Sequence, residues 1–131
     1  MPSVFSRILK GELPCHKILE NERFFAFLEM KPVNPGHTLV IPKEEVDYFF
    51  DLDDQAMGEG MVFAKKVAAA IKKAVPCGKI GVMIAGLEVR HAHIHLIPMF
   101  ESVSELSFSR AKTATDQDLS EVARRIRSHL N

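Results

Sequence analysis

The sequence contains no tryptophan, a single tyrosine and only two cysteines, and its acidic and basic side chains balance at seventeen each. Cys15 and Cys77 show neither the pattern of a secreted disulfide framework nor metal-ligand spacing, so we expect reduced thiols in a cytoplasmic protein. With no net charge, the chain has no overall field to attract nucleic acid or an anionic membrane, so any anion site must be local. The N-terminal segment has no long apolar run, which argues against a signal peptide or a membrane span.

The chain is long enough for one domain with a real core and too short for two. Apolar residues make up 47% of it and charged residues 26%, as in a soluble globular protein. No repeat or low-complexity tract divides the sequence. We therefore predict a single domain over residues 1–131.

Apolar spacing and turn residues predict two substantial helices. The longer one begins near Asp53 and stops at Pro76. Its apolar stripe consists of Met57, Met61, Ala64, Val67, Ala68, Ile71 and Val75. Thr115 followed by Asp118 resembles a capping box and predicts the start of a final helix. A short helix over residues 3–10 would begin at Ser3 as its N-cap.

Five strands are expected between these helices. They cover residues 17–21, 23–29, 37–41, 79–85 and 89–97. Residues 101–114 form an irregular segment. Because most of the strands are adjacent in sequence, the pattern favours an antiparallel α+β domain.

The strand predicted over residues 89–97 contains the run His-Ala-His-Ile-His, which holds half of the six histidines. Alternation along a strand puts His91, His93 and His95 on one face, which we expect to be open, while Ala92 and Ile94 face a core. Imidazole is the side chain whose pKa lies nearest neutrality. Such a row suits nucleophilic attack, phosphate contact, proton transfer or metal ligation.

Three segments together resemble the histidine triad (HIT) superfamily of nucleotide-binding phosphohydrolases and nucleotidyl transferases. They are residues 4–32, the run PGHTLVIPKEEV at residues 35–46, and the histidine run itself. The resemblance covers about residues 3–100, so residues 101–131 would be a C-terminal extension. It implies a HIT-like antiparallel sheet with one long helix, paired as a homodimer.

The resemblance also implies the roles of the histidines. His93 would attack the α-phosphorus of a nucleotide and form a transient nucleotidyl-histidine, with its other N–H held by the backbone carbonyl of His91. His95 would contact the phosphate and assist the leaving group, and His37 would complete the cluster. No cofactor is needed for this chemistry.

A purine nucleotide, with adenosine favoured, is the substrate that the resemblance implies. The apolar positions that would enclose its base are Val4, Phe5, Ile8, Phe27, Leu28 and Met30. Glu29 stands where an acidic residue would accept hydrogen bonds from the ribose hydroxyls.

The sequence departs from the family at two places. Where many members carry the cysteines and the histidine of a structural zinc site, this chain has Ser3, Ser6 and Glu45, so we predict no metal there. In the loop before the triad, Leu87 and Glu88 replace neutral polar phosphate contacts.

Two other functions remain open at this stage. Glu88 could have disabled the phosphate site and left a nucleotide-binding module with little catalysis. Alternatively, three neutral imidazoles with an open position could form a catalytic zinc site. Plain structural or surface histidines would explain the triad, but they would not explain the PGHTLVIPK segment that accompanies it.

Overall fold

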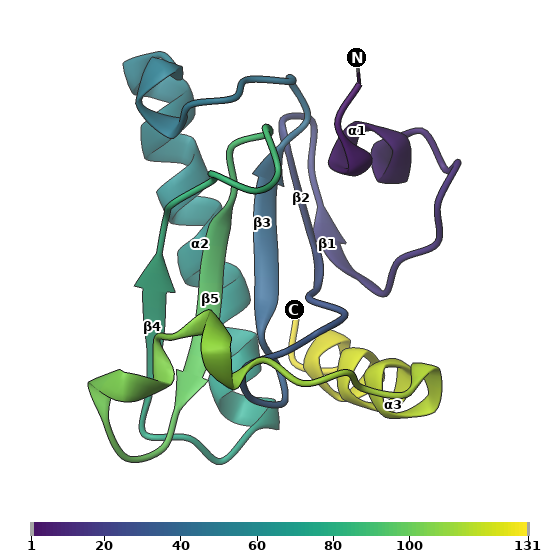
Figure 1. Cartoon of the computed structure of the whole chain (residues 1–131), viewed down its shortest axis with the longest axis vertical. Helices are drawn as coiled ribbons and strands as arrows, with labels where there is room; N and C mark the ends of the chain where they lie inside the picture. The colour runs from purple at the N-terminus through teal and green to yellow at the C-terminus, as the bar shows by residue number, and fades with distance from the viewer. Residues whose placement is uncertain (1, 131) are drawn as a thin grey trace.

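The computed structural model describes residues 2–130 as a five-stranded antiparallel sheet with three α-helices (Figure 1). The strands lie in the order β1-β2-β3-β5-β4. Their bounds are β1 Lys17–Glu20, β2 Phe24–Leu28, β3 Thr38–Pro42, β4 Lys79–Met83 and β5 Ile94–Met99. The predicted α+β class with about five antiparallel strands is confirmed.

Three α-helices and three short 3₁₀ turns surround the sheet. The helices are α1 Val4–Leu9, α2 Asp54–Ala74 and α3 Asp116–Arg127, and the turns are η1 Phe49–Asp51, η2 Val103–Glu105 and η3 Phe108–Arg110. Each helix begins where the sequence predicts, because Ser3, Asp53 and Thr115 each accept a hydrogen bond from the backbone N–H three residues later. Among residues 2–130, no helix is long and apolar enough to cross a membrane.

Helix α2 runs along one face of the sheet and supplies more of the main core than any other element (Figure 1). That core joins α2 and α3 to the inward residues of the strands, among them Ala26, Leu28, Val40, Ile94 and Leu96. Met61, a member of the predicted apolar stripe, lies outside this core and is 41% exposed. Phe63 and Ala70, which lie outside the predicted stripe, are buried, and Phe63 packs against Phe24 of β2.

The opposite face of the sheet carries the other half of the alternating residues. Its cluster contains Phe5 from α1 together with Phe25, Phe27, Leu39 and Ile41. Leu39 pairs with His95 in the neighbouring strand, so the histidines share this face. We call it the histidine face, and we call the face that packs on α2 and α3 the helix face.

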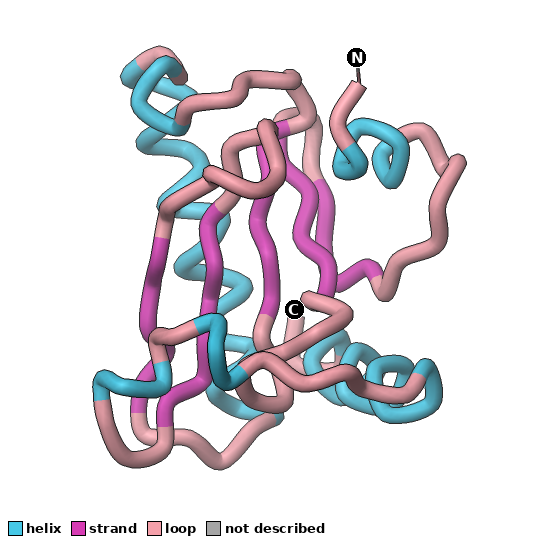
Figure 2. Tube along the Cα trace, in the orientation of Figure 1, coloured by secondary structure: helices cyan, strands magenta, loops and turns pink. Residues whose placement is uncertain are grey.

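The histidine strand is shorter than predicted. Strand β5 begins at Ile94 rather than at Val89, so His91 and His93 lie just before it in extended loop (Figure 2). Strand β4 ends at Met83, opposite His95, and offers the earlier residues no partner. The backbone N–H of Ala92 instead donates to the carbonyl of Val46, in the loop after β3.

Candidate active site

His93 has a defined tautomer because its Nδ1 lies 2.7 Å from the backbone carbonyl of His91. A carbonyl oxygen only accepts hydrogen bonds, so the proton of the neutral ring is on Nδ1. The Nε2 atom then carries a free lone pair. This is the arrangement that a nucleophilic imidazole requires.

His37 and His95 are fixed by a second chain of hydrogen bonds. The backbone N–H of Val33 donates to His37 Nδ1 at 3.0 Å, which places the His37 proton on Nε2. His37 Nε2 therefore donates to His95 Nδ1 at 2.9 Å. The remaining proton of His95 is then on Nε2, so His95 presents a donor where His93 presents an acceptor.

Burial keeps all three of these rings neutral at physiological pH. It lowers the pKa of His37 to about 4. Burial, aided by the neighbouring His93 and His37 rings, lowers the pKa of His95 to about 3. The pKa of His93 is also lowered, mainly by burial. A neutral His93 can therefore act as a nucleophile at neutral pH.

The triad is buried, whereas the sequence predicts an open face. His91, His93 and His95 are 0%, 6% and 7% exposed. The ring of Phe5 lies 5.0 Å from that of His93, and the ring of Phe108 lies 4.6 Å from that of His95. The expectation is wrong because α1 and the segment after β5 cover this face, which strand alternation alone does not reveal.

The six apolar residues of the predicted nucleoside pocket do not all lie on the same face of the sheet. Phe5 and Phe27 pack together on the histidine face, with ring centroids 5.5 Å apart, and Ile8 lies against their cluster. Leu28 points to the helix face and belongs to the main core. Val4 and Met30 are exposed. The structure therefore brings three of the six apolar positions together beside the histidines.

Glu29 lies at the end of β2, in the register that faces the histidines, and is partly buried. Burial raises the pKa of its carboxyl group, and the negative charge of Glu88 adds to the rise. The Lys31 backbone N–H, 3.4 Å from Glu29 Oε1, opposes it. Glu88 is itself exposed, as is its neighbour Leu87.

The segment after β5 contains residues that the sequence analysis missed. Glu105 is buried, and its carboxylate accepts hydrogen bonds from the backbone N–H groups of Phe100, Glu101 and Ser102 and from the Asn34 side chain. These donors lower the pKa of Glu105 to about 2. This anchor holds the segment that places Phe108 on His95. The Ser102-x-x-Glu105 capping box was the available sequence signal.

The donors around the histidines do not fit a metal ion. Within residues 2–130, no group of three or more His, Cys, Asp and Glu side chains could hold one. At the predicted zinc-free position, Ser3 and Ser6 offer hydroxyls, which are poor zinc ligands, and a Ser3 hydroxyl already lies 2.9 Å from His91 Nδ1.

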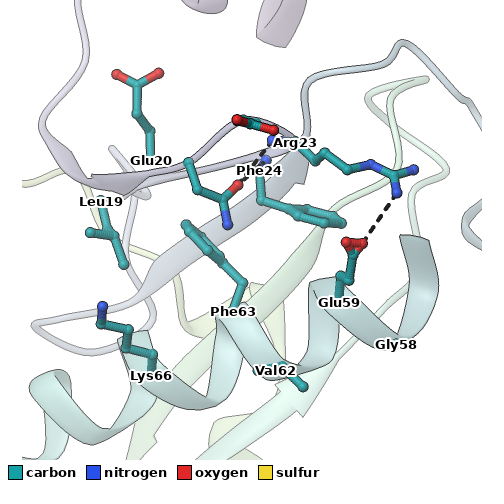
Figure 3. A pocket seen from close by; sticks show the side chains of 11 residues that line it. Leu19, Glu20, Arg23, Phe24, Gly58, Glu59, Val62, Phe63 and Lys66 are labelled. Atoms are coloured by element: carbon teal, nitrogen blue, oxygen red, sulfur yellow. Dashed lines mark hydrogen bonds and ion pairs between the residues drawn. The ribbon is translucent and has the colours of Figure 1, made fainter. Parts of the chain in front are cut away.

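Two cavities of the described structure lie away from His93. One of about 740 Å³ lies between the β1–β2 hairpin and α2, with Leu19, Phe24 and Phe63 on its floor and charged residues around it (Figure 3). Another of about 440 Å³ lies between the 32–37 loop and α3, and Glu29 and His37 contribute to its wall. Neither is lined by His93 or His95.

Comparison with known proteins agrees with this geometry. The HIT domain family matches residues 10–102. An uncharacterized HIT-like protein of Methanocaldococcus jannaschii is 35% identical over 129 residues, covering 95% of this chain and 98% of its own length. The adenosine 5'-monophosphoramidase of Saccharomyces cerevisiae is 34% identical, covering 88% of this chain and 73% of its own length.

Solved structures show the same relationship. A HIT-like protein from Bartonella henselae superposes with a TM-score of 0.86 at 31% identity, covering 98% of this chain and 96% of that one. A histidine triad nucleotide-binding protein from Sulfolobus tokodaii gives a TM-score of 0.85 at 30% identity, covering 96% and 90%. With the sequence match, the fold and the clustered histidines all in agreement, the chain belongs to the HIT family.

Proposed function

We propose that this protein hydrolyses nucleotides at a nucleoside 5'-phosphoryl group, with a nucleoside 5'-phosphoramidate as the favoured substrate class. The observation that supports it most directly is the pairing of a free Nε2 lone pair on His93 with an Nε2–H donor on neighbouring His95. The ring centroids of these two residues are 4.8 Å apart. A phosphoryl group bound there would meet a nucleophile and a hydrogen-bond donor together.

The proposed reaction has two steps. In the first, His93 Nε2 forms a bond to phosphorus, the bond from phosphorus to the leaving nitrogen breaks, and the amine leaves with a proton from solvent. His95 Nε2–H donates to a phosphoryl oxygen or to the leaving group as charge develops there. The His91 carbonyl stabilises the imidazolium that forms on His93. In the second step, water attacks phosphorus, the bond from phosphorus to His93 Nε2 breaks, and a proton of the water passes to solvent. The nucleoside monophosphate is released and His93 is again neutral.

Adenosine is the nucleoside we favour. Two of the relatives, from Saccharomyces cerevisiae and Schizosaccharomyces pombe, are named adenosine 5'-monophosphoramidases. Phe5, Ile8 and Phe27 form an apolar cluster beside the histidines, and a purine base would pack against such side chains. A partly buried Glu29 carboxylate at the end of β2 would accept hydrogen bonds from the ribose hydroxyls.

Turnover of adenosine 5'-phosphoramidate tests the proposal. We expect release of adenosine monophosphate by the wild-type protein and a labelled adenylyl group trapped on His93 when the reaction is quenched in base. His93→Ala should show neither, and His129→Ala, which changes an exposed histidine, should match the wild type. Tight nucleotide binding without any turnover would instead establish the binding module, for which the Glu88 charge near Glu29 is the supporting observation.

We further propose that two copies pair through the β4 edge. Strand β4 ends the sheet, so its outer backbone groups lack a strand partner in the described chain. Val82 and Ile84 are exposed there, and Met61 is exposed on the flank of α2 that faces away from the 740 Å³ cavity. Light scattering should give twice the chain mass, and Val82→Glu should reduce it to one chain, whereas Val62→Glu, at an exposed residue of α2 that lines the 740 Å³ cavity, should not.

Cytoplasmic location is proposed from the thiols. Cys15 and Cys77 are both free and only partly buried. An oxidising compartment would leave such thiols open to oxidation or to pairing with other chains. Fractionation of the native host, with immunodetection of this chain, tests the proposal.

A further inference from the structure

The start of α1 is tied to His91 by a connected set of hydrogen bonds. Ser3 Oγ lies 2.9 Å from His91 Nδ1, and the Ser3 backbone N–H donates to Glu45 Oε1 at 2.7 Å. The Ser6 hydroxyl donates to the same carboxylate oxygen, and the Ser6 backbone N–H donates to Ser3 Oγ at 3.0 Å. We call Ser3, Ser6 and Glu45 the α1 anchor.

The positions of the protons in this set follow from the partner of each atom in the neutral His91 ring. His91 Nε2 donates to the backbone carbonyl of Pro42 at 2.8 Å, so His91 Nδ1 carries a lone pair. Ser3 must therefore direct its hydroxyl proton at His91 Nδ1. Ser3 Oγ then has a lone pair for the Ser6 N–H, while the Ser6 hydroxyl proton goes to Glu45. Each donor has one acceptor, and the His91 ring is held at both nitrogens.

The residue whose ring is fixed, His91, is also the residue that hydrogen-bonds the nucleophile His93. His91 is fully buried, and its own backbone carbonyl accepts the Nδ1–H of His93. Because only two rotatable bonds join the ring to the main chain, the held ring restrains the backbone of residue 91, and without the α1 anchor that backbone would be free to rotate. The carbonyl would then move away from His93, and the proton of that ring would no longer be confined to Nδ1.

We infer that the α1 anchor positions His93 by holding His91, and that it thereby keeps His93 Nε2 free to attack phosphorus. Ser3, Ser6 and Glu45 touch neither His93 nor a bound phosphoryl group in this role. They are positioning residues that act through the ring and carbonyl of His91. The kinetic part of this inference rests on the proposed function, whereas the tautomer of His93 can be measured independently.

A purely structural role is the competing explanation. The anchor also fastens α1 to the loop after β3, and Phe5 of α1 packs on both His91 and His93. If fastening α1 were its only role, variants of the anchor would unfold at lower temperature. The folded molecules would keep the wild-type kcat and the wild-type His93 tautomer.

The first measurement is kinetic. Ser3→Ala/Ser6→Ala removes both hydroxyls, because Ser6 Oγ lies 3.4 Å from His91 Nδ1 and could replace Ser3. We expect kcat for adenosine 5'-phosphoramidate to fall about 10- to 100-fold, as for a small misplacement of a reacting group, with KM changing less than about threefold. Ser3→Thr keeps the hydroxyl and should restore kcat to within about threefold.

Glu45→Ala provides a second variant in case the double variant does not fold. It removes the common acceptor of Ser3 and Ser6, and we expect kcat to fall about 10-fold. Glu44→Ala changes the adjacent exposed carboxylate, which makes no hydrogen bond to α1, and is its matched control. Thermal unfolding confirms that each variant is folded at the assay temperature.

The second measurement is nitrogen NMR of protein labelled at histidine. In the wild type, His93 should show the Nδ1–H tautomer and His91 the Nε2–H tautomer. In Ser3→Ala/Ser6→Ala and in Glu45→Ala, His93 should show a mixture of the two. An unchanged His93 spectrum in folded variants overturns the inference. If the wild type turns over no phosphoramidate, the proposed function fails, and the NMR result alone decides the role of the anchor.

Discussion

The two faces of the sheet are built from alternating residues of the same strands, yet they are closed by different interactions. The helix face packs Ile94 and Leu96 of β5 against α2 and α3 through apolar contacts. The histidine face holds His93 and His95 through hydrogen bonds, under α1 and the segment anchored by Glu105. Figure 1 shows α2 along one face and the green segment after β5 crossing the other.

We expect the helix face to contribute mainly to the stability of the fold and the histidine face mainly to its chemistry. Apolar burial has no preferred direction, so the helix face stabilises the fold in proportion to the area it removes from water. Hydrogen bonds require particular partners, and a buried group that loses its partner costs about 1–3 kcal/mol. Every buried side-chain nitrogen and oxygen within residues 2–130 has a partner. The histidine face therefore fixes individual protons, which the helix face does not.

The largest effect is expected at the nucleophile. His93→Ala should lower turnover of adenosine 5'-phosphoramidate at least roughly a thousandfold, because a covalent nucleophile is lost. The free energy of unfolding should fall by only about 1–3 kcal/mol, since the His91 carbonyl loses its partner. Steady-state kinetics and urea unfolding measure the two quantities. Turnover near the wild-type rate would rule out the mechanism.

Truncation of a buried side chain on the helix face should lower stability more than it lowers kcat. Ile71→Ala removes a fully buried side chain from α2 and should lower the free energy of unfolding by about 2–5 kcal/mol. The kcat of the folded variant should stay within about twofold of the wild type, because no hydrogen bond of the triad changes. A loss of kcat approaching that of His93→Ala would show that the two faces are not separable.

Acid should weaken the fold through the histidine face. His37 and His95 have pKa values of about 4 and 3 when folded, while an unfolded histidine has about 6.5. Below pH 6.5 the unfolded chain takes up protons that the folded chain does not, so stability is full above pH 6.5 and falls as the pH drops towards 4. Between pH 7.5 and 5.5 we expect a loss of roughly 1 kcal/mol for each of the two rings.

Urea unfolding at several pH values between 7.5 and 5.5 measures this slope. His37→Gln should flatten it, and His129→Gln, at an exposed site, should leave it unchanged. An equal slope in the His37 variant would mean that the folded ring is protonated like an unfolded one. The kcat of the wild type should fall at a lower pH than the titration of an unfolded histidine, since burial lowers the pKa of His93.

The smallest effect is expected at Glu88, in the exposed loop before the histidines. Glu88→Gln removes a negative charge whose field reaches Glu29. Affinity for adenosine monophosphate should rise about two- to threefold at low salt and less at high salt, because the lost repulsion is screened. Calorimetric titration at two salt concentrations measures the change. Equal affinities at low salt would place Glu88 too far from the nucleotide to matter.

Local signals predicted most of the fold. Asp53 and Pro76 bracket α2, and Thr115 opens α3, because capping and proline geometry act within a few residues. Alternation correctly separated Leu96 from His95 across β5. The predicted start of β5 was wrong because the first residue of β5 depends on where its partner β4 ends. The burial of the three histidines under the segment after β5 was not predicted because residues 101–114 lack a periodic pattern.

The sequence by itself determined the types of the elements, the grouping of the histidines and the resemblance to the HIT family. Only the tertiary structure decided which nitrogen of His91 and which nitrogen of His95 carries the proton. Those protons are assigned by partners far apart in the chain: His37 and His95 are separated by 58 positions, and Ser3 and His91 by 88. A hydrogen bond needs its two atoms within about 3 Å, and that proximity exists only once the sheet has brought the strands together and α1 has packed on the histidine face.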